Sequence, residues 1–174
     1  MKPKRIKLAV SSCLLGENVR YDGGNKYDAC IAETFGEHFE LIPICPEVGA
    51  GLAIPRPPIQ LISLNNRIRA IGAEDPERDV SDRLTAFARQ QVNTLDELCG
   101  YIFKSRSPSC GVTDTRIMTD HGEITGPGLY ASLIMTAQPQ LPVIDEQRLK
   151  SATGRDNFLE RVFARHRWHC LHGA

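Results

Sequence analysis

Six cysteines stand out in this sequence of 174 residues as the side chains best suited to chemistry. No two of them form a Cys-x-x-Cys pair, so the spacings of zinc ribbons, thioredoxin-like motifs and bacterial ferredoxins are absent. A metal site built from these cysteines must therefore be assembled by the fold from segments that are distant in the sequence. The six are Cys13, Cys30, Cys45, Cys99, Cys110 and Cys170.

Cys13, Cys45 and Cys110 each follow a segment that the sequence predicts to be a buried strand. Because the carboxyl ends of parallel strands meet at one edge of a sheet, these three thiols can converge there. Three thiolates can hold zinc with one position left for water, or three irons of a [4Fe–4S] cluster with one iron left open. The residue types alone leave both choices open. The cysteines that we do not expect to be ligands are Cys30, Cys99 and Cys170.

Hydrophobic periodicity predicts the elements that must position these cysteines. Strands are predicted at 5–11, 39–44, 100–104 and 142–145, and helices at 27–37, 80–98, 126–137 and 158–166. A small hairpin over 59–71 is predicted to turn at Asn65 and Asn66. Strands that alternate with helices predict an α/β, single-domain, three-layer Rossmann-like fold with a mostly parallel sheet. The cysteine site is expected at the carboxyl ends of its strands.

Composition narrows the class of protein further. With 21 basic and 21 acidic residues the net charge is zero, which argues against a general nucleic-acid binder. No apolar run approaches the ~20 residues of a membrane span, and the N-terminal segment has no secretory signal core. We therefore expect a cytoplasmic protein with one domain over 1–174, in which 151–174 forms a C-terminal helix and basic tail.

Three loops rich in glycine and proline each carry one of the selected cysteines. They are Ser-Cys-Leu-Leu-Gly-Glu-Asn-Val-Arg-Tyr-Asp-Gly-Gly over 12–24, Cys-Pro-Glu-Val-Gly-Ala-Gly-Leu-Ala-Ile-Pro-Arg-Pro-Pro over 45–58, and Lys-Ser-Arg-Ser-Pro-Ser-Cys-Gly over 104–111. Together they resemble the thiouracil desulfidase family over roughly residues 5–150. The resemblance implies a [4Fe–4S] enzyme that removes sulfur from thiolated uracil, a small-molecule substrate.

The resemblance also implies roles for particular residues. Cys13, Cys45 and Cys110 match the cluster ligands of the family, which leave one iron open. Glu47 matches a catalytic glutamate, expected to act as general acid and base. Ser107 matches a catalytic serine that would hydrogen-bond the substrate or the iron-bound sulfur. The implied reaction is a non-redox, iron-assisted hydrolysis that yields uracil and hydrosulfide.

Polar residues in the same three loops are candidates for substrate binding. Asp22 has a structural alternative, because an ion pair with Arg20 would fix the first loop. Arg56 lies among prolines, where it could bind substrate or cover the core with its apolar stem. The candidates are Ser12, Asp22, Arg56 and Ser109.

Two other functions fit the same residues. A zinc-dependent hydrolase could use the same three cysteines, and its purified form would be colourless. A non-enzymatic iron–sulfur or sulfur carrier would show no turnover and would not need Glu47 in a pocket with rigid proline walls.

Overall fold

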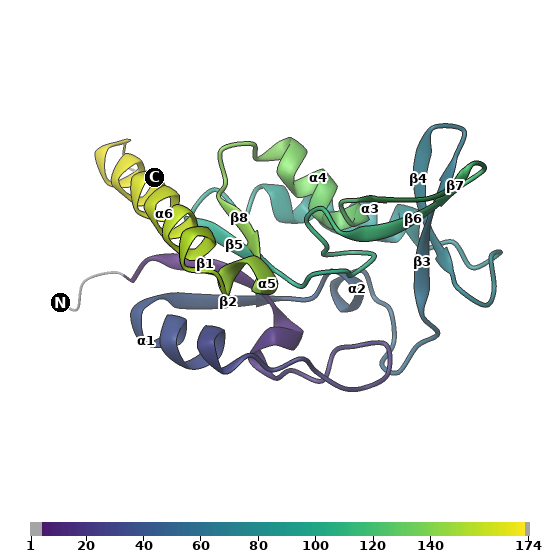
Figure 1. The fold of residues 1–174 in the computed structure, drawn as a ribbon, viewed down its shortest axis with the longest axis horizontal. Helices are drawn as coiled ribbons and strands as arrows, with labels where there is room; N and C mark the ends of the chain where they lie inside the picture. Colours follow the sequence, from purple (N-terminus) through teal and green to yellow (C-terminus); the bar gives the residue numbers. More distant parts are fainter. Residues whose placement is uncertain (1–4, 173–174) are drawn as a thin grey trace.

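The computed structural model describes residues 5–172 and has a four-stranded parallel sheet at its centre, in the order β2-β1-β5-β8 (Figure 1). Its strands are β1 (Lys7–Ser11), β2 (Glu40–Ile44), β5 (Gly100–Phe103) and β8 (Val143–Asp145). All four lie where the sequence predicts strands. The chain passes from β1 to β2 on one side and then to β5 on the other, so β1 lies at a topological switch point.

Helices cover both faces of this sheet, because alternate residues of each strand point to opposite faces. Leu8 and Val10 of β1 pack in one core, whereas Ala9 packs in the other. The first core is covered by η2, a π-helix (Cys30–Phe35), and by α5 (Glu146–Leu149) and α6 (Ala152–His172). The short α1 (Gly36–His38) continues η2 and buries no side chain. The second core is covered by α3 (Ser81–Val92) and α4 (Leu129–Ala137). The predicted three-layer α/β fold with a mostly parallel sheet is confirmed.

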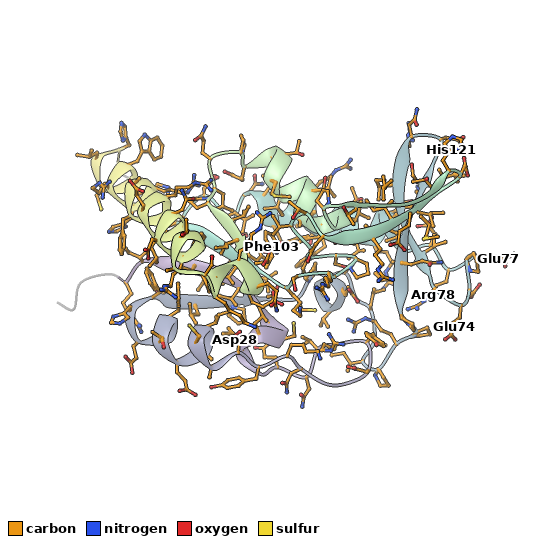
Figure 2. The ribbon with its side chains drawn as sticks, viewed as in Figure 1. Asp28, Glu74, Glu77, Arg78, Phe103 and His121 are labelled. Carbon is orange, nitrogen blue, oxygen red and sulfur yellow. The ribbon has the colours of Figure 1, made fainter. Side chains whose placement is uncertain are left out.

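A second sheet, in the order β4-β3-β6-β7, lies at one end of the molecule (Figures 1 and 2). Its first hairpin was predicted: Asn65 and Asn66 have φ of 51° and 60°, as a type I′ turn requires. Its second hairpin was not predicted, because β7 is almost entirely exposed and carries no alternating apolar pattern. The strands are β3 (Ile59–Leu64), β4 (Arg67–Gly72), β6 (Thr115–Thr119) and β7 (Gly122–Gly126).

The predicted helix over 80–98 is six residues too long. It ends at Val92, because the backbone N–H and the hydroxyl of Thr94 both bond to the carbonyl oxygen of Gln91 and form a turn. Leu95 and Leu98 remain buried, which explains the extended apolar pattern. Conversely, the last helix extends well beyond both ends of its predicted range. Among the described residues, every helix is too short or too polar to cross a bilayer.

Leu84 tests the packing between α3 and the second sheet. Its side chain is fully buried, whereas Leu171 near the end of α6 is 81% exposed. We expect Leu84→Ala to lower the free energy of unfolding by about 2–5 kcal/mol, because it leaves a cavity. Leu171→Ala, the matched control, should change it by less than about 0.5 kcal/mol. Urea unfolding measures both, and equal effects would contradict this packing.

Candidate active site

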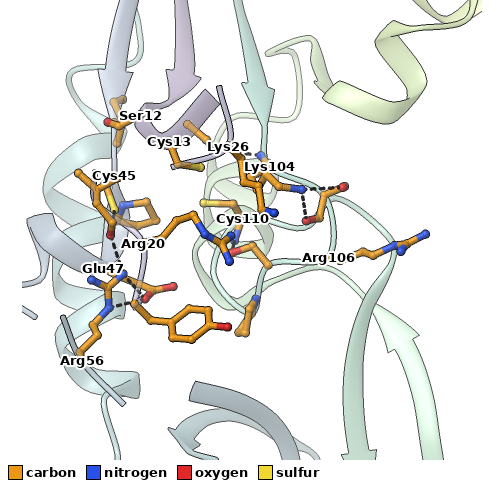
Figure 3. Close-up of a pocket in the computed structure, with 18 residues that line it drawn as sticks. Ser12, Cys13, Arg20, Lys26, Cys45, Glu47, Arg56, Lys104, Arg106 and Cys110 are labelled. Carbon is orange, nitrogen blue, oxygen red and sulfur yellow. Dashed lines mark hydrogen bonds and ion pairs between the residues drawn. The ribbon is translucent and has the colours of Figure 1, made fainter. Parts of the chain in front are cut away.

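The three selected cysteines line one cavity of about 420 Å³ at the carboxyl ends of the central strands (Figure 3). Cys13 lies in a short 3₁₀ helix, η1 (Ser12–Leu15), directly after β1. Cys45 follows β2 and precedes α2 (Pro46–Gly49), and Cys110 lies in the loop after β5. The convergence expected from the sequence is present in the structure.

Burial keeps the three thiols protonated at neutral pH in the chain alone. It raises the pKa of Cys13 to about 11 and also raises the pKa of Cys45 and Cys110. The thiolates also repel one another: Cys45 raises the pKa of Cys13, and both raise that of Cys110. A metal centre held here must therefore displace thiol protons when it binds.

The loop of Cys110 is shaped by Ser107. Its hydroxyl oxygen accepts hydrogen bonds from the backbone N–H groups of Ser109 (3.2 Å) and Cys110 (3.0 Å). Its carbonyl oxygen accepts from the N–H of Gly111 and the hydroxyl of Thr115, both at 2.9 Å. A Cβ at Gly111 would lie 1.9 Å from the Thr115 hydroxyl, so this tight loop requires glycine there. Ser107 thus positions Cys110 and also lines the cavity.

Glu47 is held from two sides beside Cys45. Its Oε2 accepts from Arg56 Nε at 2.8 Å and pairs with Nη2 at 2.7 Å, and its Oε1 accepts from the Ser109 hydroxyl at 2.9 Å. Arg56 also donates to the carbonyl oxygens of Ala53 (3.1 Å) and Val19 (3.0 Å). Its side chain is only 3% exposed. Arg56 therefore joins the second loop to the first and fixes the Glu47 carboxylate.

A second buried ion pair, between Lys104 and Glu146, lies beside Cys13, on the side of the cavity away from Glu47. Figure 3 shows its Lys104. Lys104 Nζ donates to Glu146 and to both the carbonyl and hydroxyl oxygens of Ser105. The N–H and hydroxyl of Ser105 donate to the same carboxylate at 2.7 and 2.6 Å. Burial raises the pKa of Glu146, but these hydrogen bonds outweigh it and the pKa is lowered. The network anchors the end of β5 to the start of α5.

The four residues expected to bind substrate lie in different positions relative to the cavity. Ser12 and Arg56 line the cavity. Ser109 is fully buried and reaches the site through Glu47. Asp22 lies outside the lining: it forms an ion pair with Arg20 at 3.4 Å and accepts from the N–H of Gly24 at 3.0 Å. The contacts of Asp22 are therefore those of the structural alternative, in which an ion pair with Arg20 fixes the first loop.

Basic side chains outnumber carboxylates among the lining residues, although four of them form ion pairs: Arg20 with Asp22, Arg56 with Glu47, Lys104 with Glu146 and Arg106 with Asp114. The residues around the cavity supply one carboxylate, that of Glu47, and five basic side chains. Lys26, Lys104 and Arg106 were not singled out in the sequence: the last two lie in the third cysteine loop, and Lys26 lies two residues after the first. The five are Arg20, Lys26, Arg56, Lys104 and Arg106.

The other three cysteines lie away from the cavity. Cys30 and Cys170 are exposed, and Cys99 is buried with its Sγ 3.8 Å from His169 Nδ1. The residues lining the cavity include no histidine and no fourth cysteine. Across residues 5–172, no three Cys, His, Asp or Glu side chains meet closely enough to hold one metal ion.

The chain belongs to the 2-thiouracil desulfurase family, whose model matches residues 8–146. It is therefore an enzyme of a class that cleaves carbon–sulfur bonds. The family expected from the three loops is confirmed, and the match covers nearly the range of the resemblance. All three cysteine loops fall inside it.

Two known proteins are similar to this chain. It is 30% identical over 139 residues to "Uncharacterized protein YbbK" of Bacillus subtilis (strain 168), a match that covers 75% of this chain and 90% of YbbK. Its fold is similar to that of the solved [4Fe–4S]-dependent thiouracil desulfidase TudS, with a TM-score of 0.63 and 27% identity. That match covers 84% of this chain and 93% of TudS.

Glu146 makes the stability of this site depend on pH. Its folded-state pKa is lower than its ordinary value, so its contribution is fully present above the unfolded pKa of about 4.3 and is lost as the pH falls through the lower folded value. We expect Glu146→Gln to reduce stability at pH 7 and to flatten the loss of stability below about pH 4.3. Unfolding curves across this pH range measure it. Exposed Glu160→Gln is the control, and an unchanged acid profile in Glu146→Gln would contradict the assignment.

Proposed function

We propose that this chain is a [4Fe–4S]-dependent desulfidase that hydrolyses thiolated uracil to uracil and hydrosulfide without net electron transfer. The observation that carries the proposal is the meeting of Cys13, Cys45 and Cys110 at one cavity, in a chain of the 2-thiouracil desulfurase family. TudS, which shares the fold, is [4Fe–4S]-dependent. The substrate is taken to be a small thiolated base.

The donor set fits a cluster better than a single zinc ion. A cluster takes each thiolate on a different iron, whereas zinc requires all ligands around one point. Among the described residues no such single point exists, although the three thiols share the cavity. The basic side chains that line the cavity would also interact favourably with a net-negative assembly of cluster and thiolates. With no fourth cysteine or histidine in the lining, the ligand set leaves one iron open.

A bound cluster would supply a Lewis acid for the soft thiocarbonyl sulfur. The chain itself would manage the protons. Glu47 accepts a proton from the water that attacks the ring carbon and returns it to the ring or to the departing sulfur. The reaction balances as thiolated uracil plus water giving uracil plus hydrogen sulfide, which releases a proton as hydrosulfide.

The contacts of Glu47 suit this role. Arg56 and Ser109 hold one oxygen each, so the carboxylate is fixed in orientation. Ser107 is assigned to the substrate or its sulfur: its oxygen accepts two backbone N–H groups, and its own hydroxyl proton is not used by either bond. Ser12 is assigned to substrate contact, whereas Arg56 acts by positioning Glu47.

Exchange of single cysteines tests the cluster. We expect Cys13→Ser, Cys45→Ser and Cys110→Ser each to lose most of the iron and sulfide, because serine is a poor cluster ligand. Cys30→Ser, which alters an exposed cysteine outside the cavity, should keep wild-type iron content. Iron, zinc and sulfide assays with an absorption spectrum on anaerobically purified protein provide the measurement. Wild-type protein that holds zinc and no iron would overturn the proposal in favour of the zinc hydrolase.

Exchange of Glu47 tests the proton transfer. Glu47→Gln keeps the size of the side chain but cannot exchange the proton, so turnover of thiouracil should fall by about 10²–10⁴-fold while iron content stays near wild type. Exposed Glu37→Gln should leave turnover unchanged. Loss of the cluster from Glu47→Gln would make this residue a ligand or scaffold residue. Wild-type turnover would contradict the mechanism.

A further inference from the structure

A second cavity lies at the amino ends of β5 and β8, away from the cysteine site. Its volume of about 780 Å³ exceeds the 420 Å³ of the cysteine cavity and falls within the range of small-molecule sites. Its walls are the segments that lead into these two strands and one face of α6. Among the described residues none lines both cavities, so the proposed reaction leaves this one without a role.

The α6 wall of the second cavity combines positive charge with an aromatic ring. Arg161, Arg165 and Trp168 line it at spacings of four and three residues, which places them along one face of the helix. The Trp168 side chain is 53% exposed, and Pro142 and Ala164 add apolar surface to the lining. The cavity therefore offers a flat apolar surface beside two guanidinium groups.

Both guanidinium groups lack an anionic partner. Arg165 Nε donates to the carbonyl oxygen of Leu98 at 2.7 Å, which fixes the side chain and leaves its two Nη groups without a partner within residues 5–172. Over the same residues, Arg161 forms no hydrogen bond or ion pair. The carboxylate in the lining, that of Asp96, accepts instead from Gln138 Nε2 at 2.6 Å. Burial lowers the pKa of Arg165, so an anion bound beside it would be favoured.

We propose that this cavity binds a small aromatic phosphate, with the ring against Trp168 and the phosphate held by Arg161 and Arg165. Guanidinium groups are planar forks that donate two hydrogen bonds to one anion. Two such forks supply more donors than one carboxylate can accept, whereas a phosphate monoester has three terminal oxygens and up to two negative charges. The indole ring supplies the stacking surface that an aromatic ring requires. This site is separate from the proposed desulfidase reaction and does not depend on it.

Trp168 is the only tryptophan of the chain, so its fluorescence reports on this cavity directly. AMP serves as the aromatic phosphate, adenosine lacks the phosphate, and inorganic phosphate lacks the ring. We expect AMP to change the fluorescence of the full-length protein in a saturable way. Adenosine and inorganic phosphate should each bind at least about 10-fold more weakly, because each keeps one of the two contacts. Added salt should weaken AMP binding, because the site is open to solvent.

Variants of α6 test the two contacts separately. Arg161→Ala should weaken AMP binding by about 10–100-fold, because it removes charge-assisted hydrogen bonds. Arg167→Ala, the matched control, alters an exposed arginine of the same helix outside the lining and should leave AMP binding unchanged. Trp168→Leu, measured by calorimetry, should reduce the affinity for AMP to that for inorganic phosphate. Thiouracil turnover should stay at the wild-type rate in all three variants.

Several results would overturn the inference. AMP and inorganic phosphate binding with equal affinity would show an anion site without a contact to the ring. Wild-type affinity for AMP in Arg161→Ala would remove the phosphate contact, and no saturable change with AMP or UMP would remove the site. Release of AMP by thiouracil would place the ligand in the cysteine cavity instead. Each of these outcomes would leave the proposed desulfidase reaction intact, whereas wild-type protein without iron would overturn that reaction and leave this site standing.

Discussion

The parallel register of β1, β2 and β5 is the constraint on which the site depends. β1 pairs with β2 from Lys7↔Glu40 to Ser11↔Ile44 and with β5 at Val10↔Ile102, so the three strands end at one edge. Side chains that follow them are brought together whatever their distance in sequence. A slip of one residue in a strand would turn its side chains to the opposite face and break both cores. The requirement for two packed cores therefore also fixes where the cysteines meet.

Burial gives the site its chemistry. The thiols lie where burial disfavours their charged form, and basic side chains surround them. Such a pocket favours a bound metal centre, because the metal would neutralise the thiolates and the basic side chains would offset the negative charge left on the assembly. The two buried ion pairs, Glu47 with Arg56 and Lys104 with Glu146, lie on opposite sides of it. Each is completed by a serine hydroxyl from the third loop, so the loop that carries Cys110 ties both sides together.

Arg56 illustrates how one side chain can organise several loops. Its guanidinium group reaches Glu47, Ala53 and Val19, and its backbone N–H donates to the Tyr21 carbonyl oxygen at 2.8 Å. The planar group with several donors makes this possible, and a lysine could not reproduce the arrangement. Its apolar stem is buried, as one of the two sequence-based alternatives proposed. Its guanidinium group, however, holds the first two cysteine loops together.

The sequence alone determined the strands of the central sheet, the α/β class and the meeting of three cysteines at one edge. These depend on local apolar patterns and on the rule that parallel strand ends converge. It did not determine the hairpin of β6 and β7, whose exposed residues carry no pattern. Nor could it show that Ser109 donates to Glu47, 62 residues away, or that Lys104 pairs with Glu146, 42 residues away. Such pairings depend on how separate loops pack in space. Only the tertiary structure could show that Tyr101, Tyr130 and Cys110 share one core, because that core joins side chains from a strand, a helix and a loop.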